Sequence, residues 1–241
     1  MNQVVQSESA ASLDAVSLGY YASIGIEKGK PFAPDARMKK ILTEAAVVGD
    51  ATARALAYKT RQKDLYFYEN SAWVSPFLGS YKFEVSPGVR NLDSFAFYYF
   101  YATGVTPAMA EKIVGQGSQY AAAFRDSKGQ ALDGAKNYRL HLPANIPIKN
   151  FWSLIVYDNQ TRSMLQTDQR FPMVSSQNEK LEINADGSVD VYFGPKAPAG
   201  KENNWVQTIP GKGWNTLLRL YSPLEPWFDR TWRPGEIEAI D

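Results

Sequence analysis

The chain has 241 residues, of which 44% are hydrophobic and 13% aromatic, and its 26 lysines and arginines nearly balance its 25 aspartates and glutamates. The charges are interspersed and form no basic stripe, so we predict no nucleic-acid partner. The sequence contains no cysteine, which excludes disulfides, cysteine-ligated metal centres and a thiol nucleophile. No apolar run is long enough for a membrane span, and residues 1–13 lack the basic start and the apolar run of an export signal.

Residues 1–105 are predicted to form a mainly helical region that packs on the rest of the chain. Apolar residues recur at helical spacing over residues 13–24, which predicts a short helix. A longer helix is predicted to begin at Pro34 and Asp35, because an apolar face follows them and the aspartate lies near the positive end of the helix dipole.

Two further segments of this region are less regular. Residues 64–68 alternate as in a short strand. Residues 91–103 (NLDSFAFYYFYAT) are dense in aromatic residues, which favours a strand, whereas a cap at Asp93 and the interspersed alanines favour a helix. We predict the helix.

From residue 118 onward the spacing of apolar residues changes to two, which is typical of strands. We predict a mainly β (α+β) fold, in which residues 106–241 form an antiparallel jelly-roll-like β-sandwich preceded by the helical N-terminal segment. Residues 120–124 and 137–142 are predicted to pair as a hairpin with a long loop. The further predicted strands are residues 151–157, 162–165, 181–183, 189–193, 205–209 and 214–221.

The segment 150–169 is predicted to lie at the centre of the sandwich. Its first part, residues 151–157, is a run of aromatic and β-branched residues that suits a strand buried on both faces. Residues 158–161 (DNQT) have short polar side chains that favour a turn, so residues 162–165 are predicted to return as the second arm of a hairpin. The tail, residues 223–234, is too aromatic to remain in solvent and is predicted to pack back on the sandwich.

Four C-terminal segments resemble a known family: DGAKNYRLHLP (133–143), NFWSLIVYDNQTRSMLQTDQ (150–169), NADGSVDVYFGPKAPAGKENNWVQT (184–208) and GWNTLLRLYSPLEPWFDRTWRPGEIE (213–238). Together they resemble the family called domain of unknown function 1214. Residues 25–42 (GIEKGKPFAPDARMKKIL) resemble the segment that leads into this domain in larger bacterial members, where a domain of unknown function 1254 precedes it. The resemblance implies an antiparallel β-sandwich, in proteins that are often exported to the periplasm, and it implies no catalytic residues.

Arginines and aromatic residues occur together on the predicted strands and in the tail, where Arg233 and Trp227 extend the pattern. Guanidinium groups orient a carboxylate or a sugar, and rings add stacking area. The first hypothesis is therefore a ligand-binding or structural β-sandwich module with an aromatic and arginine cleft for a carbohydrate or a small organic acid. Side chains of this kind are also typical of bridges between strands at the rim of a sandwich. The predicted ligand-binding residues are Trp152, Tyr157, Arg162, Asp168, Arg219 and Tyr221.

The second hypothesis is a carboxylate-dependent glycan hydrolase or lyase, which needs two carboxylates across a cleft, one as acid and one as base or nucleophile. The acidic residues next to aromatic residues are Asp158, Asp168, Glu225 and Asp229. His141 is the single histidine, so a site with two or three histidine ligands is excluded and a structural role is predicted for it. No cofactor and no metal are predicted. A third hypothesis is a homo-oligomeric scaffold, in which the aromatic tail packs across a subunit boundary.

Overall fold

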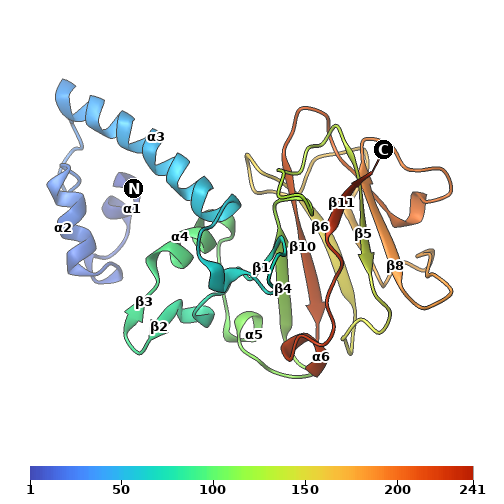
Figure 1. Cartoon of the computed structure of the whole chain (residues 1–241). Helices are drawn as coiled ribbons and strands as arrows, with labels where there is room; N and C mark the ends of the chain where they lie inside the picture. The colour runs from blue at the N-terminus through green and yellow to red at the C-terminus, as the bar shows by residue number, and fades with distance from the viewer. Residues whose placement is uncertain (241) are drawn as a thin grey trace. The chain divides into compact units, whose positions relative to one another are not determined.

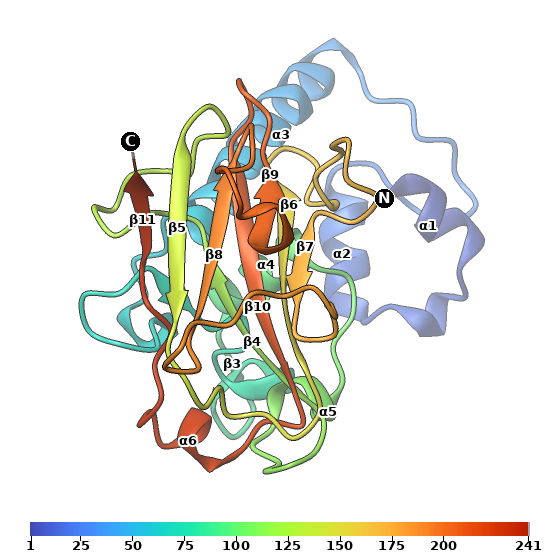
Figure 2. The same ribbon diagram turned by 90° about the vertical axis from the view of Figure 1, so that its right-hand side faces the viewer.

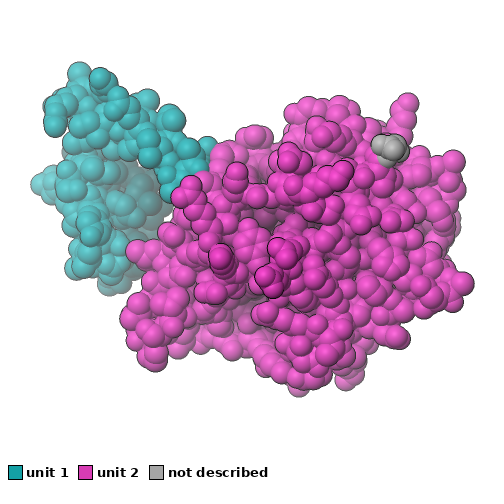
Figure 3. Space-filling view, viewed as in Figure 1, with its two compact units in different colours: residues 1–52 teal, residues 53–241 magenta. Residues whose placement is uncertain are grey.

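The computed structural model describes residues 1–240, which divide into two compact units (Figure 3). The first unit comprises residues 1–52, and the second begins at residue 53. Residues 53–105 lie in the same unit as the strands that follow them. The predicted boundary after residue 105 stays a prediction.

The first unit is helical, as predicted. It contains α1 (Asn2–Ser7), the 3-10 turn η1 (Ala10–Ser12), α2 (Ala15–Ser23) and the larger part of α3 (Ala36–Tyr58). The side chain of Asp35 caps α3, because its Oδ1 accepts a hydrogen bond from the backbone N–H of Met38 at 2.7 Å. Val5 and Ile26 are the buried hydrophobic residues of this unit, so its core is small.

The second unit contains two sheets packed face to face (Figures 1 and 2). The five-stranded sheet has the order β1 (Trp73–Val74), β4 (Ser118–Ala123), β10 (Trp214–Tyr221), β6 (Trp152–Asp158) and β7 (Met173–Ser175). The four-stranded sheet has the order β11 (Ile237–Ile240), β5 (Asn137–Leu142), β8 (Val189–Gly194) and β9 (Trp205–Gln207). All neighbours pair antiparallel except β8 and β9, which are parallel. The predicted, mainly antiparallel sandwich is confirmed.

The core between the two sheets follows from the alternation of side chains along each strand. On β10, Trp214, Leu218 and Leu220 face the second sheet and are fully buried. The Trp214 ring contacts Tyr138 of β5 and Phe193 of β8, with ring centres 5.5 and 4.9 Å apart. Part of the aromatic content of the sequence thus lies in this core.

Short elements surround the sandwich. They are the 3-10 turns η2 (Lys63–Leu65), η3 (Ser80–Lys82) and η4 (Glu202–Asn204), the small hairpin of β2 (Glu84–Ser86) and β3 (Val89–Arg90), and the helices α4 (Leu92–Tyr101), α5 (Pro107–Ala110) and α6 (Glu225–Phe228). The predicted helix at 91–103 is confirmed as α4, but its cap is Asn91 instead of Asp93, because the Asn91 side chain accepts from Ser94 N at 3.0 Å. The predicted strand at 64–68 is wrong, since η2 occupies its first two residues and Tyr66 forms only an isolated bridge with Val74.

One predicted hairpin is wrong, and a second is formed only in part. β4 and β5 belong to different sheets, and one isolated bridge, Arg125 with Ala131, joins the segments between them. β10 pairs with one edge of β4 over six residues and β1 pairs with the other edge at Ala122 and Ala123, whereas β5 pairs with β8 and β11. Residues 162–165 form no strand either. Arg162 has a left-handed φ of 61°, only Met164 bridges to Tyr157, and β7 takes the edge of β6 in place of this segment.

Residues 181–183 are also not a strand, and they lie between two turns. The side chain of Asn204 takes the place of a neighbouring strand. Its Oδ1 accepts from Glu182 N at 2.9 Å, and its Nδ2 donates to Glu182 O at 2.8 Å. A side-chain amide therefore satisfies backbone groups that the sequence pattern assigns to a sheet.

The tail packs on its own chain, as predicted. Trp227 and Trp232 are buried in the sandwich core, and β11 pairs with β5. The scaffold hypothesis expects the tail to pack on another subunit instead of on its own chain, and oligomerisation stays a prediction. Across residues 1–240, no helix is long and apolar enough to cross a membrane.

Candidate functional site

The candidate site lies on the outer face of the five-stranded sheet. On β10, Asn215, Leu217, Arg219 and Tyr221 alternate with the core residues and therefore point away from the second sheet. Figure 1 shows α4 and α5 on this side of β4 and β10. α4 covers one part of the face through Tyr101, whose hydroxyl donates to Asn215 Oδ1 at 2.9 Å.

Arg219 lies at the centre of this face. It is opposite Tyr120 of β4 and Ser153 of β6 in the two strand pairs. The guanidinium carbon lies 5.4 Å from the centre of the Tyr120 ring and 5.4 Å from the centre of the Tyr221 ring. The cation thus lies near one ring on the neighbouring strand β4 and one ring on its own strand.

The positive charge of Arg219 has no acidic partner. Within residues 1–240, no carboxylate lies within salt-bridge distance of its guanidinium. Its Nε is buried and lacks a hydrogen-bond partner in the same part of the chain. Burial acts to lower the pKa of Arg219. The hydrogen bond to Tyr120 and the nearby hydroxyls of Tyr221 and Tyr157 outweigh burial and raise this pKa, so the side chain stays charged.

The neighbouring tyrosines do not neutralise this charge. Burial raises the pKa of Tyr157 and of Tyr221, although Arg219 acts in the opposite direction on both. Burial also raises the pKa of Tyr101 well above its usual value. These phenols are therefore neutral at neutral pH, and they offer dipoles and ring faces to the guanidinium but no negative charge.

Three of the six predicted site residues lie together here: Tyr157, Arg219 and Tyr221. The other three lie elsewhere. Trp152 is buried between the sheets, in the sandwich core. Arg162 lies over the ring of Phe100 at 4.4 Å, and Asp168 accepts from Gln207 Nε2 at 3.1 Å.

Sequence reasoning missed Tyr120 and Tyr101. Tyr120 was assigned to a strand but not to the site, because its place beside Arg219 depends on the pairing of β4 with β10. Tyr101 reaches Asn215 from α4, 114 residues earlier in the chain. No local pattern signals either contact.

The four carboxylates of the hydrolase hypothesis do not meet at one site. Asp158 is opposite Trp214 at the start of β10, whereas Glu225 and Asp229 follow the end of that strand. Burial disfavours the charge of Asp158, but hydrogen bonds from Lys212 and Gln160 N hold its pKa below the usual value. Hydrogen bonds from Thr231 likewise lower the pKa of Asp229. A general acid needs a raised pKa, so these two groups are unsuited to that role.

The contacts of His141 are those of a residue that joins two neighbouring strands. Its Nδ1 lies 2.9 Å from Asp190 Oδ1 on the neighbouring strand, and Asp190 also accepts from Asn184 Nδ2 at 3.1 Å. Across the described residues, no group of three or more histidine, aspartate or glutamate side chains is arranged to hold a metal ion.

Residues 117–225 match the model of a family described as "Protein of unknown function (DUF1214)". This match to DUF1214 covers somewhat less than half of the chain. It begins just before β4 and ends at the start of α6, so the matched segment contains Tyr120, Tyr157, Arg219 and Tyr221. The resemblance found in the sequence is thereby confirmed, while the link to a domain of unknown function 1254 stays a prediction.

Two solved structures are similar to the chain. The VPA0106 protein from Vibrio parahaemolyticus is 21% identical, with 100% of this chain and 54% of that protein covered and a TM-score of 0.48. An uncharacterised protein from Burkholderia cenocepacia is 18% identical, with 94% and 48% covered and a TM-score of 0.40. The chain thus spans about half the length of these two proteins. No curated protein matches it.

Proposed function

We propose that the segment matched to DUF1214 binds a small organic acid at Arg219. The observation that carries this proposal is a half-buried guanidinium with no carboxylate partner within residues 1–240. A charge in such a place is costly unless a counter-charge reaches it. A ligand carboxylate supplies that charge and accepts two parallel hydrogen bonds from the planar guanidinium.

The surrounding side chains favour an acid with a flat or apolar body. Tyr221 stacks on Phe151, with ring centres 4.0 Å apart and ring planes inclined by 17°. Tyr120 adds another ring, whose centre lies 5.4 Å from the guanidinium carbon. Rings of this kind provide contact area for a ligand body, while their hydroxyls offer hydrogen bonds to its polar edge.

The carboxylate-dependent hydrolase or lyase lacks comparable support. No pair among Asp158, Asp168, Glu225 and Asp229 flanks Arg219, and none of them is among the groups that shift its pKa. We therefore propose binding instead of catalysis for this face.

The test is isothermal titration of the chain with benzoate, succinate and glucose. Benzoate or succinate is expected to bind and glucose is not. Arg219→Gln should lose acid binding, whereas Arg139→Gln should keep it, because Arg139 lies on β5 and pairs with Glu238 at 3.2 Å. Equal acid binding by Arg219→Gln and the unaltered chain, or no binding of either acid, would refute the proposal.

A further inference from the structure

A second candidate binding site in the unit that begins at residue 53 is formed by the loop of residues 66–72 and the tail. Glu236 holds the loop, because its two oxygens accept from Ser71 Oγ at 2.6 Å and from Ala72 N at 2.8 Å. The Tyr68 hydroxyl donates to Trp232 O at 3.2 Å. The tail thus fixes the loop, and two hollows border it.

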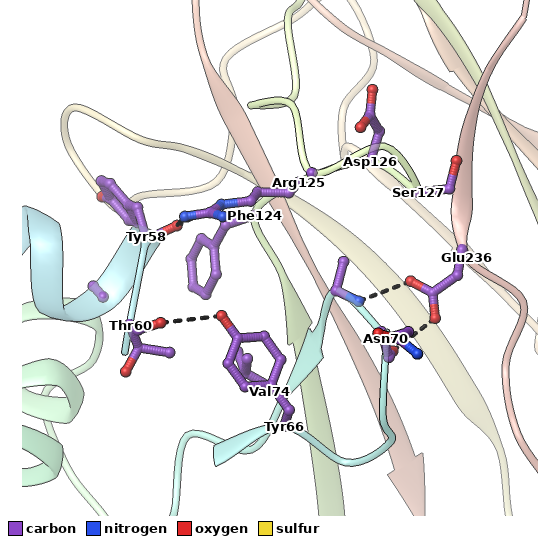
Figure 4. Close-up of a pocket in the computed structure, with 14 residues that line it drawn as sticks. Tyr58, Thr60, Tyr66, Asn70, Val74, Phe124, Arg125, Asp126, Ser127 and Glu236 are labelled. Atoms are coloured by element: carbon purple, nitrogen blue, oxygen red, sulfur yellow. Dashed lines mark hydrogen bonds between the residues drawn. The ribbon is translucent and has the colours of Figure 1, made fainter. Parts of the chain in front are cut away.

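The first hollow is a cavity of about 310 Å³ (Figure 4). The rings of Tyr66 and Phe124 line one side, and Asn70 and Glu236 line the other. Arg125 crosses above and donates through Nε and Nη2 to Tyr58 O at 3.3 Å. A cavity of this size with rings on one side and polar groups on the other suits a small hydroxylated molecule.

Some polar side chains of the cavity form hydrogen bonds within the protein, and others are available to bond a ligand. Both oxygens of Glu236 accept hydrogen bonds, and the Tyr66 hydroxyl donates to Thr60 O at 3.2 Å. The amide of Asn70 and Nη1 of Arg125 have no hydrogen-bond partner within residues 1–240. An amide both donates and accepts, so it matches the hydroxyl groups of a sugar.

The second hollow is an open groove of about 890 Å³ that shares Tyr66, Asn70 and Ser71 with the cavity. Its charged lining residues are Lys63, Arg230 and Arg233 against a single acid, Glu69. Arg233 is fixed over the Tyr68 ring at 4.7 Å and pairs with Glu236 at 2.9 Å. Arg230 and Lys63 form no salt bridge in the described part of the chain.

Tyr68 leaves the positive charge of the groove intact. Burial raises its pKa to about 12, although Arg233 and Arg230 act in the opposite direction. The phenol is therefore neutral and offers a ring face beside the cations. The groove has a net positive charge, and it opens beside a cavity that is suited to hydroxyl groups.

We propose that the cavity and the groove together form a second binding site, for a sugar that carries a carboxylate or a phosphate. The hydroxylated ring lies in the cavity against Tyr66, Phe124 and Asn70. The acidic group lies in the groove near Arg230 and Lys63. The site is separate from Arg219, which lines neither hollow.

The test measures dissociation constants for glucose, glucuronate, glucose 6-phosphate and inorganic phosphate. At least one acidic sugar is expected to bind about tenfold more tightly than both glucose and inorganic phosphate, since each lacks one half of the interaction. Binding by glucuronate alone identifies a sugar acid, and binding by glucose 6-phosphate alone a sugar phosphate. Equal binding of glucose, or of inorganic phosphate, overturns the proposal, and so does the absence of binding.

Two variants test the two halves of the site. Arg230 and Asn70 have left-handed φ values of 64° and 54°, so Arg230→Asn and Asn70→Gly keep residues that tolerate this backbone conformation. Arg230→Asn should weaken the acidic sugar about tenfold and leave glucose unchanged. Asn70→Gly should weaken the acidic sugar and leave inorganic phosphate unchanged. Unchanged binding of the acidic sugar in both variants overturns the proposal.

Arg219→Gln separates this site from the one proposed above. It is expected to bind the acidic sugar as the unaltered chain does. Loss of this binding in Arg219→Gln would place the acidic sugar at Arg219 and overturn the second site.

Discussion

Arg219 of β10 lies directly opposite Tyr120 of β4, with its guanidinium carbon 5.4 Å from the centre of the Tyr120 ring. This cross-strand pair puts a cation on the outer face of a sheet where the nearby tyrosines Tyr157 and Tyr221 are neutral. The sandwich therefore carries a charge for which residues 1–240 provide no ion pair.

The first prediction concerns the stability of this arrangement. Arg219→Met should leave the free energy of unfolding unchanged or raise it by about 1 kcal/mol, because it removes a half-buried charge and an unbonded Nε. Arg125→Met is the matched variant. It should lower the free energy of unfolding by about 1 kcal/mol, since two bonds to Tyr58 O are lost. Urea unfolding measures both, and a larger loss in Arg219→Met than in Arg125→Met would contradict the prediction.

The second prediction concerns the contact between α4 and β10. Tyr101→Phe should lower the free energy of unfolding by about 1 to 2 kcal/mol, because the buried Asn215 Oδ1 loses the hydroxyl that donates to it at 2.9 Å. Tyr99 lies on the same helix and is 45% exposed, so Tyr99→Phe serves as the control and should change little. Thermal and urea unfolding measure the stability of both variants. Equal stability of the two would contradict the prediction.

The third prediction concerns the attachment of the tail. Glu236→Gln should lower the free energy of unfolding by about 2 kcal/mol, because charge-assisted bonds to Ser71, Ala72 and Arg233 are lost or weakened. Glu238→Gln is its control. Glu238 is exposed and pairs with Arg139 at the surface, so its replacement should cost less than about 0.5 kcal/mol. A comparable loss in both variants would show that Glu236 has no special part in holding the loop.

The fourth prediction concerns pH. The carboxylate of Asp158, which is 3% exposed, accepts from Lys212 Nζ at 2.5 Å. Although burial disfavours its charge, this bond and the one from Gln160 N hold the pKa of Asp158 below the usual 3.8. A lowered pKa in the folded state stabilises the fold at pH values above the unfolded pKa, and this contribution is lost as the pH falls through the folded pKa.

Lys212→Met should therefore lower the free energy of unfolding by about 1 kcal/mol at pH 7, a value reduced because Lys212 is 44% exposed. The difference from the unaltered chain should shrink as the pH falls below about 4. Lys136→Met, at an exposed lysine without a salt bridge in the described residues, should show no such pH dependence. An effect of Lys212→Met that is constant from pH 7 to pH 3 would speak against the ion pair.

The strands of the sandwich were largely predictable, but their partners were not. The alternation along residues 214–221 is strong, because one face lies in the core and the other does not. The pairing of this strand with residues 118–123 joins segments about a hundred positions apart. Local turn signals favour neighbouring segments as partners, and this is why 120–124 and 137–142 were wrongly expected to form a hairpin.

The positions of the predicted site residues also depend partly on local sequence and partly on strand pairing. Trp152 and Tyr157 are five positions apart on one strand, so their side chains point to opposite faces of the sheet. Arg219 and Tyr221 are two positions apart and share a face. Counting positions along the strand would have separated Trp152 from the outer face that carries Tyr157. The place of Tyr120 was beyond such counting, since it requires the register of two distant strands.

The bond between Ser71 and Glu236 joins residues that are 165 positions apart. Such a contact forms only after the intervening chain has been brought together, and the entropy of closing so long a loop must be overcome first. We therefore expect the loop of residues 66–72 to become ordered late in folding, after the central strands have paired. The hollows beside this loop then exist only in the completed fold, so a ligand bound there would report on the last step of folding.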